Sequence, residues 1–144
     1  MNQNKVKILL VEDDTNFGKV LKNYLELNDY VVELARDGIL GLAAFRREKF
    51  DLCICDVMMP ELDGYGVLHM LGKDPATLAI PFIFLTAKSE SVDVRKGMGM
   101  GADDYITKPF EEMDLLDAVE MRLKKSEALI AGSTRSIGGV QGFM

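Results

Sequence analysis

The chain has 144 residues, which predicts one domain, and its composition of 48% hydrophobic and 28% charged residues is typical of a folded globular protein. These values exclude collagen-like, coiled-coil and disordered classes. The 17 basic and 23 acidic side chains give a formal net charge of −6, so this segment lacks the basic surface that direct nucleic-acid binding requires.

Two features of the sequence predict a cytoplasmic protein. The first apolar run, residues 8–11, is too short for a signal-peptide core or a membrane span, so we expect no membrane partner. Cys53 and Cys55 lie two positions apart in another apolar run, where a strand would point both side chains to the same face. Because this geometry does not suit a disulfide, we expect buried free thiols and a reducing compartment.

Five short apolar runs alternate with amphipathic stretches, a pattern typical of a mostly parallel sheet covered by helices on both faces. We expect strands at residues 6–11, 30–34, 52–55, 82–85 and 105–107. The first, third and fourth runs are almost entirely apolar, which predicts central strands buried on both faces. Glu33 interrupts the second run and indicates an edge strand. The sequence therefore predicts a doubly wound α/β fold.

Apolar residues at helical spacing predict a helix after each run. The expected helices cover residues 15–27, 40–45, 65–71, 92–100 and 113–123. Thr15 and Asp37 are candidate N-caps of the first two helices. Three glycines between residues 97 and 101 weaken the fourth helix.

The composition changes after Lys125. Residues 131–139 are rich in small polar residues and glycine, as is typical of a linker. We therefore expect a domain over residues 1–125 and a linker or tail over residues 126–144 that can lead to an output domain.

Polar side chains follow four of the expected strands, at the point where each strand ends. They are Glu12, Asp13 and Asp14 after the first strand, Asp56 after the third, Thr86 after the fourth and Lys108 after the fifth. Ligands bind at the carboxyl ends of the strands in this class of fold, so we expect these side chains to converge. Taken alone, each has an ordinary explanation, and Asp14 is best explained as an N-cap or a first-turn charge.

The acidic residues at this edge need a cation, because carboxylates within a few ångströms repel one another unless a cation or a proton neutralises them. Hard oxygen ligands favour Mg²⁺, for which we expect Mn²⁺ to substitute. An ion with open positions can bind a phosphoryl group, whose oxygens suit the ammonium of Lys108 and the hydroxyl of Thr86. In this interpretation the carboxylate of Asp56 is the nucleophile.

Four motifs occur in order along the chain: ILLVEDD at 8–14, CDVMMPELDG at 55–64, FLTA at 84–87 and GADDYITKPF at 101–110. With these motifs the chain resembles the receiver domain of two-component response regulators, a CheY-like family. The resemblance covers residues 5 to about 125. It implies a flavodoxin-like (βα)5 three-layer sandwich whose five parallel strands have the order 2-1-3-4-5.

The resemblance also implies a role for each residue of this edge. Asp56 would accept a phosphoryl group from a sensor histidine kinase or a phosphotransfer protein, which makes the domain a signalling phosphoacceptor and not an enzyme. Asp13 would bind Mg²⁺ directly and Glu12 mainly through water, while Asp56 and the backbone carbonyl of Met58 would complete the metal ligands. Lys108 would contact the phosphoryl oxygens, and the peptide bond that follows it is expected to be cis.

A conformational switch is implied as well. Thr86 would move toward the phosphoryl group, and Tyr105 would change rotamer as Thr86 moves. The surface made by the fourth helix, the fifth strand and the fifth helix would then change. That surface would control an output domain or a homodimer contact.

Three other functions would use the same fold. An aspartate-nucleophile phosphohydrolase needs an acid–base aspartate two residues after the nucleophile, where this chain has Met58. A flavin or nucleotide carrier needs a phosphate loop rich in glycine and hydroxyl groups after the first strand, where the acidic run 12–14 would repel a phosphate. A non-phosphorylated interaction module would not need the acceptor, the lysine and the threonine, all of which this chain has.

Overall fold

The structure is a five-stranded parallel sheet between two layers of helices. A computed structural model describes residues 5–87, 99 and 102–139 of the chain. The strands are β1 (Lys7–Val11), β2 (Val31–Ala35), β3 (Leu52–Asp56), β4 (Phe82–Thr86) and β5 (Asp104–Thr107). Their order in the sheet is β2-β1-β3-β4-β5, and each neighbouring pair is parallel. The expected doubly wound fold and its strand order are confirmed.

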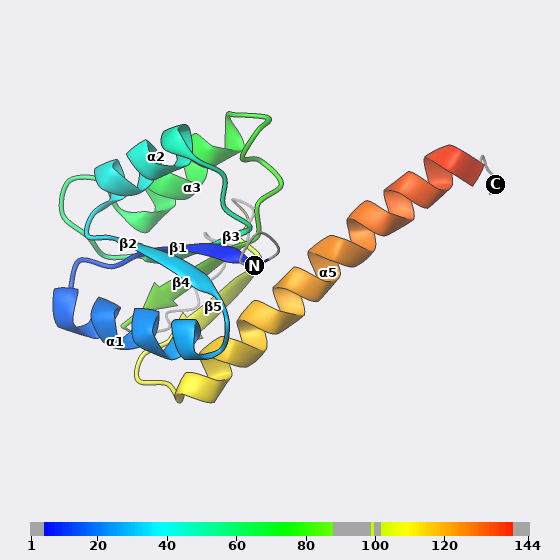
Figure 1. Cartoon of the computed structure of the whole chain (residues 1–144). Coiled ribbons are helices and arrows are strands. Elements are labelled where there is room, and N and C mark those ends of the chain that lie inside the picture. The colour runs from blue at the N-terminus through cyan, green and yellow to red at the C-terminus, as the bar shows by residue number, and fades with distance from the viewer. Residues whose placement is uncertain (1–4, 88–98, 100–101, 140–144) are drawn as a thin grey trace.

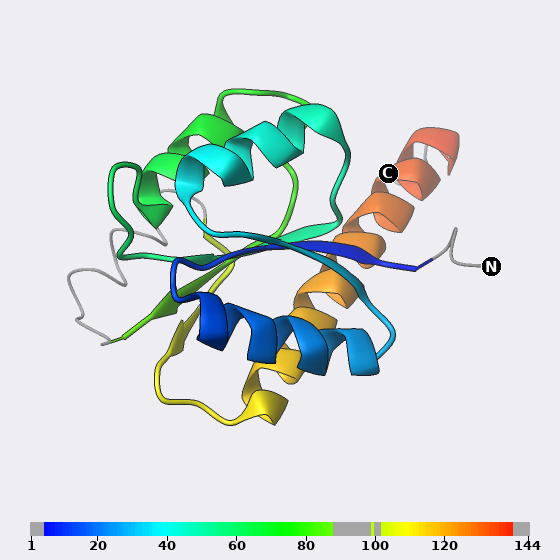
Figure 2. The ribbon, with the colours of Figure 1, turned by 60° about the vertical axis from the view of Figure 1, so that its left-hand side comes forward.

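Helices cover both faces of the sheet. They are α1 (Thr15–Leu27), α2 (Gly38–Arg47), α3 (Gly64–Gly72) and α5 (Glu112–Gly139). Helices α2 and α3 lie on one face, and α1 and the first part of α5 lie on the other (Figure 1 and Figure 2). The helix expected at 92–100 lies, apart from Gly99, outside the described residues. Within the described ranges no helix is long and apolar enough to cross a membrane.

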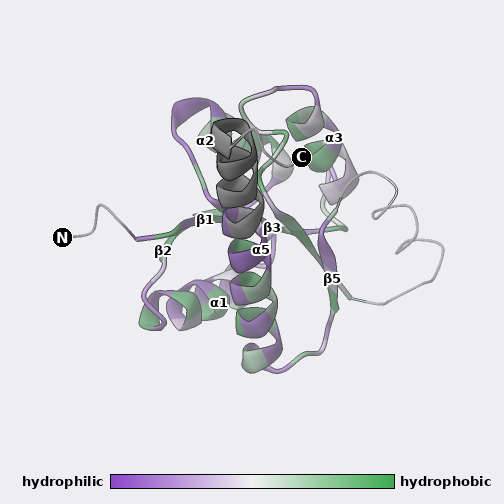
Figure 3. Cartoon of the chain, turned by 90° about the vertical axis from the view of Figure 1, so that its right-hand side faces the viewer, coloured by the Kyte–Doolittle hydropathy of each residue, from purple (hydrophilic) through white to green (hydrophobic). Residues whose placement is uncertain are grey.

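Side chains that alternate along the strands form two hydrophobic cores. On β1, Leu9 and Val11 pack toward α2 and α3, whereas Ile8 and Leu10 pack toward α1 and α5. Strands β3 and β4 are buried on both faces and the edge strand β2 is only partly buried, as the apolar runs predicted. Figure 3 shows hydrophobic and hydrophilic bands alternating around α1 and the first part of α5. Burial on both faces fixes the register of the central strands and hence the position of the residues at their ends.

The first two helices begin next to residues that the sequence predicts as N-caps. Helix α1 is capped by Asp14, whose Oδ1 accepts a hydrogen bond from the backbone N of Phe17 at 3.1 Å. The N-cap role expected for Asp14 is thus confirmed, whereas Thr15, the other candidate cap, is the first helical residue, because the carboxylate one position earlier satisfies the free N–H group and interacts favourably with the helix dipole. Asp37 caps α2 as predicted, and its Oδ1 accepts from the backbone N of Leu40 at 2.8 Å.

Helix α5 extends well beyond the sheet (Figure 1). It continues to Gly139, although the expected helix ends at residue 123 and the composition of residues 131–139 predicts a linker. Residues 127–131 are mostly strong helix formers, and extending an existing helix adds one hydrogen bond per residue. The segment is therefore helical in the structure. The division into a domain over 1–125 and a following segment over 126–144 stays a prediction.

Both cysteines are free thiols buried on β3, as predicted. They lie in the core that faces α2 and α3. Burial raises the pKa of the Cys53 thiol and of the Cys55 thiol. Both groups are therefore protonated and unreactive at neutral pH, as befits core residues.

The start of α3 packs against the end of β3 without room for a side chain. A Cβ atom at Gly64 would collide with the carbonyl oxygen of Asp56, and it would lie 2.9 Å from the Phe84 ring and 3.0 Å from the Cα atom of Val57. The backbone N of Gly64 also donates a hydrogen bond to the carbonyl oxygen of Val57 at 2.9 Å. The close approach of two backbone segments therefore requires glycine at this position.

We expect Gly64→Ala to lower the free energy of unfolding by about 1–3 kcal/mol, because a methyl group would push α3 away from β3. The matched control is Gly72→Ala at the other end of α3, where an added Cβ meets no atom within 4 Å. That change should leave stability unchanged or raise it by up to about 1 kcal/mol. Urea unfolding measures both variants, and equal free energies of unfolding would contradict the close-contact explanation.

Candidate functional site

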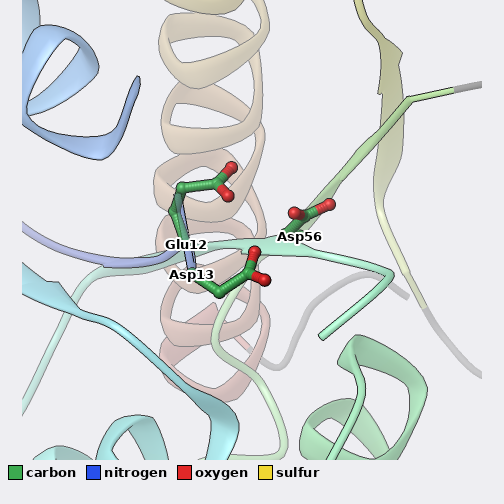
Figure 4. A group of neighbouring side chains, drawn as sticks. All are labelled: Glu12, Asp13 and Asp56. Carbon is green, nitrogen blue, oxygen red and sulfur yellow. The ribbon is translucent and has the colours of Figure 1, made fainter. Parts of the chain in front are cut away.

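Three carboxylates lie together at the carboxyl edge of the sheet. Glu12 and Asp13 directly follow β1, and Asp56 is the last residue of β3. One carboxylate oxygen of each lies within 4.8 Å of the others, and Figure 4 shows the three side chains around a shared space. The pairing of β1 with β3, in which Val11 is opposite Cys55, brings the two segments side by side. The structure therefore brings these three predicted residues together, while the fourth acid of the sequence prediction serves as the cap of α1.

Burial makes this acidic cluster electrostatically unfavourable. Glu12 is fully buried and Asp56 is 6% exposed, whereas Asp13 is exposed. Burial raises the pKa of Glu12 to about 7, although hydrogen bonds from the backbone N of Asp14 and from Lys108 oppose the shift. Burial also raises the pKa of Asp56, against the neighbouring charge of Lys108. The site therefore favours a cation that compensates the carboxylate charge.

Lys108 brings a positive charge to this cluster from the end of β5. Its Nζ atom lies 3.0 Å from Oε1 of Glu12 and 3.4 Å from Oδ2 of Asp56. Burial lowers the pKa of Lys108, but the contacts with Glu12 and Asp56 raise it by more, so the side chain stays charged. The backbone N of Lys108 donates a hydrogen bond to the carbonyl oxygen of Thr86 at 2.6 Å, which ties the lysine to β4. The peptide bond between Lys108 and Pro109 is cis, as predicted.

Phe17 on α1 also contacts Lys108, which the sequence analysis did not anticipate. The ammonium lies 4.6 Å from the centroid of the Phe17 ring, within the range of a cation–π interaction. The ring of Phe110 packs edge-on against Phe17 with a centroid distance of 6.0 Å. In the sequence Phe17 is one of several apolar residues at helical spacing, so only tertiary packing distinguishes it from the others.

Thr86 and Tyr105 lie on the same face of two adjacent strands. Thr86 is the buried last residue of β4 and is opposite Thr107 of β5, while Phe84 is opposite Tyr105. Because residues two apart on a strand share a face, Tyr105 lies beside Phe84 and one step along the strand from Thr86. The ring centroids of Phe84 and Tyr105 are 5.1 Å apart. A coupled movement of Thr86 and Tyr105 requires this placement, and the movement itself stays a prediction.

The donor atoms of the cluster fit a hard divalent cation. All three side chains offer carboxylate oxygens, which Mg²⁺ and Mn²⁺ prefer to softer ligands. A bound cation would also compensate the negative charge that burial makes unfavourable. Met58, whose carbonyl is the further expected ligand, follows Asp56 by two residues and has a side chain that is 73% exposed. Its role as a ligand stays a prediction.

The fold and the site define the class of protein: a flavodoxin-like α/β domain with an acidic cluster and a lysine at the carboxyl edge of its sheet. The sequence model of the response regulator receiver domain matches residues 8–120, so the chain belongs to this family of two-component signalling domains.

Individual relatives agree with this assignment. The chain is 46% identical over 121 residues to the transcriptional regulatory protein RprY of Bacteroides fragilis strain YCH46, a match that covers 84% of the chain and 50% of the relative. It is similar to the structure of the Francisella response regulator 1452 receiver domain, with 31% identity, a TM-score of 0.79 and coverage of 85% of this chain and 99% of that one. It is also similar to a CheY-like receiver domain protein from Methanospirillum hungatei JF-1, with 30% identity, a TM-score of 0.82 and coverage of 87% and 98%. The chain spans about half the length of the curated relatives that it matches.

The raised pKa of Glu12 predicts that the stability of the metal-free protein depends on pH. Between its ordinary value of 4.5 and about 7, the folded chain keeps a proton on Glu12 that the unfolded chain releases. The free energy of unfolding should therefore fall as pH rises through this window. Glu12→Gln removes the effect, so its stability relative to the wild type should rise by up to about 3 kcal/mol between about pH 5 and about pH 8. Urea unfolding in EDTA measures both proteins, and parallel pH profiles would refute the prediction.

Proposed function

We propose that Asp56 is the phosphoacceptor of this receiver domain and takes a phosphoryl group from a phosphohistidine on a sensor histidine kinase or a phosphotransfer protein. The observation that carries the proposal is the ammonium of Lys108, 3.4 Å from Oδ2 of Asp56 and beside two further carboxylates. A carboxylate nucleophile, a cationic partner for phosphoryl oxygens and a donor set for a hard cation thus share one edge of the sheet.

The transfer needs an ionised carboxylate at Asp56. One of its oxygens bonds to phosphorus while the phosphorus–nitrogen bond of the phosphohistidine breaks. The electron pair of that bond goes to the imidazole, which leaves as a neutral group when its other nitrogen carries a proton. Burial raises the pKa of Asp56 and Lys108 lowers it, so the lysine helps to keep the nucleophile ionised. The same ammonium is within reach of the new phosphoryl oxygens and stabilises their charge.

Glu12, Asp13, Asp56 and the backbone carbonyl of Met58 would hold Mg²⁺, or Mn²⁺ in its place. When bound, the cation offsets the negative charge of the carboxylates and of the incoming phosphoryl group. The exposure of Asp13 supports a direct bond from this residue. Glu12 is engaged with Lys108 at 3.0 Å, which supports a less direct contact with the metal and makes Glu12 a residue that orients the lysine.

Thr86 and Tyr105 would change position in response to phosphorylation of Asp56. The hydroxyl of Thr86 would bond a phosphoryl oxygen, Tyr105 would follow, and the surface of β5, α5 and the expected fourth helix would change. The relative RprY is a transcriptional regulatory protein about twice as long as the matched region. We therefore propose a cytoplasmic regulator in which a following output domain controls transcription, with a second copy of the chain as the other candidate partner.

The residue two positions after Asp56 supports a signalling role over that of a phosphohydrolase. This residue is Met58, whose exposed thioether can act neither as a general acid nor as a general base. Hydrolysis of the aspartyl phosphate should therefore be slow, and a slowly lost phosphoryl group suits a signal.

We expect acetyl phosphate with Mg²⁺ to add the mass of one phosphoryl group to the wild-type chain. Asp56→Asn keeps the size of the side chain but removes the nucleophilic charge, so this variant should gain no mass. EDTA should abolish the gain in the wild type. Intact-protein mass spectrometry measures all three samples, and an equal gain in Asp56→Asn would show that another residue is the acceptor.

Phe17→Leu should slow phosphorylation by acetyl phosphate about threefold to tenfold, because it removes the aromatic face that contacts Lys108 and keeps an apolar side chain. Phe17→Tyr should keep the wild-type rate. Phe45→Leu is the matched control on α2, where Phe45 packs against Phe50, and it should also keep the wild-type rate. Time courses of intact mass give the rates, and an unchanged rate in Phe17→Leu would rule out a contribution of the ring.

A further inference from the structure

Four aromatic side chains form a connected group on the face of the sheet that α3 covers. This aromatic cluster consists of Tyr65, Phe82, Phe84 and Tyr105. The ring centroid of Phe84 lies 5.1 Å from that of Tyr65, 5.1 Å from that of Tyr105 and 4.9 Å from that of Phe82. Through Phe84, the cluster links α3, β4 and β5 by direct ring contacts.

Within the aromatic cluster, Tyr65 and Tyr105 also meet at their hydroxyl groups. The two oxygen atoms lie 2.8 Å apart, and either hydroxyl can be the donor of the hydrogen bond. Tyr65 is only 9% exposed, and a buried phenol hydroxyl is unfavourable without a partner. The bond therefore fastens the ring of Tyr105 to the first turn of α3.

The position of Tyr65 is in turn fixed next to the proposed phosphoacceptor. Its neighbour Gly64 packs on the carbonyl oxygen of Asp56 so closely that no Cβ atom fits, and the backbone N of Gly64 donates a hydrogen bond to the carbonyl oxygen of Val57. The first turn of α3 is thus held in close backbone contact with the end of β3. Tyr65 therefore reaches Tyr105 with its hydroxyl from a helical turn that packs closely against β3.

We propose that Tyr65 is a positioning residue whose hydroxyl holds Tyr105 in an inward orientation, against Phe84. The proposal rests on the proposed function in one respect, namely that Tyr105 is the residue moved by the switch. An outward turn of Tyr105 breaks the hydrogen bond and the contact with Phe84. The hydrogen bond alone favours the inward orientation about twofold to tenfold. Tyr65 therefore sets part of the bias between the two orientations.

Tyr65→Phe tests this role, because it removes the hydroxyl and keeps the ring in the aromatic cluster. The chain has four tyrosines, so NMR of the chain with ¹³C-labelled tyrosine rings can follow Tyr105 in the absence of phosphate and metal. We expect the Tyr105 signal to move toward that of an exposed tyrosine, as the ratio of inward to outward orientations falls about twofold to tenfold. Tyr24→Phe on α1 should leave the signal unchanged. A Tyr105 signal that is identical in Tyr65→Phe and the wild type would overturn the proposal.

A double-mutant cycle gives a second measurement that does not depend on the NMR signal. Tyr105→Phe removes the same hydrogen bond from the other side. If the bond exists in solution, the double variant should lose less stability in urea unfolding than the sum of the two single variants. Strictly additive losses would overturn the proposal.

The positioning role and the phosphoacceptor role can fail separately. If Asp56 gains no phosphoryl group but the Tyr105 signal still shifts in Tyr65→Phe, the proposed function is wrong and the positioning role of Tyr65 is supported. If Asp56 is phosphorylated and the Tyr105 signal does not respond to Tyr65→Phe, the positioning role is wrong and the phosphoacceptor stands.

Discussion

The ammonium of Lys108, held between two buried carboxylates, is the interaction on which the rest of the site depends. Glu12 and Asp56 are almost fully buried, and burial raises the pKa of each. Two neighbouring carboxylates in such surroundings cannot both be ionised at neutral pH unless a positive charge lies beside them. The lysine supplies that charge from the end of β5, beside the proposed nucleophile at the carboxyl edge of the sheet.

Contacts of this kind require strand ends that cannot shift. Side chains of β1 and β3 alternate between two cores, so a slip of one residue would turn every apolar side chain to the wrong face. On the other side of Asp56, the backbone of Gly64 packs so closely on the end of β3 that no side chain fits between α3 and β3 at this point. The carboxylates and the lysine are therefore carried by the ends of packed strands, which keeps the distances between them constant.

Site residues at the ends of strands could be predicted from the sequence, whereas residues whose role depends on tertiary packing could not. Glu12, Asp56 and Lys108 each stand at the end of an apolar run, and parallel pairing brings such positions together wherever the sheet forms. Phe17 and Tyr65 belong to apolar helix faces, and helical spacing does not reveal which side chain each one meets. The composition of residues 131–139 is typical of a linker, whereas α5 continues to Gly139, because extending a helix that has already formed adds one hydrogen bond per residue.

Two segments of the chain lie between Asp56 and Tyr105, namely strand β4 and the start of helix α3. On β4, Leu85 is opposite Asp56 and Phe84 is opposite Tyr105, whereas α3 connects the two residues through Gly64 and Tyr65. The Tyr65 hydrogen bond contributes to the free-energy difference between the inward and outward orientations of Tyr105, so this difference contains a contribution from α3. A side chain outside the acidic cluster can thus shift the balance between the two orientations of Tyr105, on which the proposed switch acts.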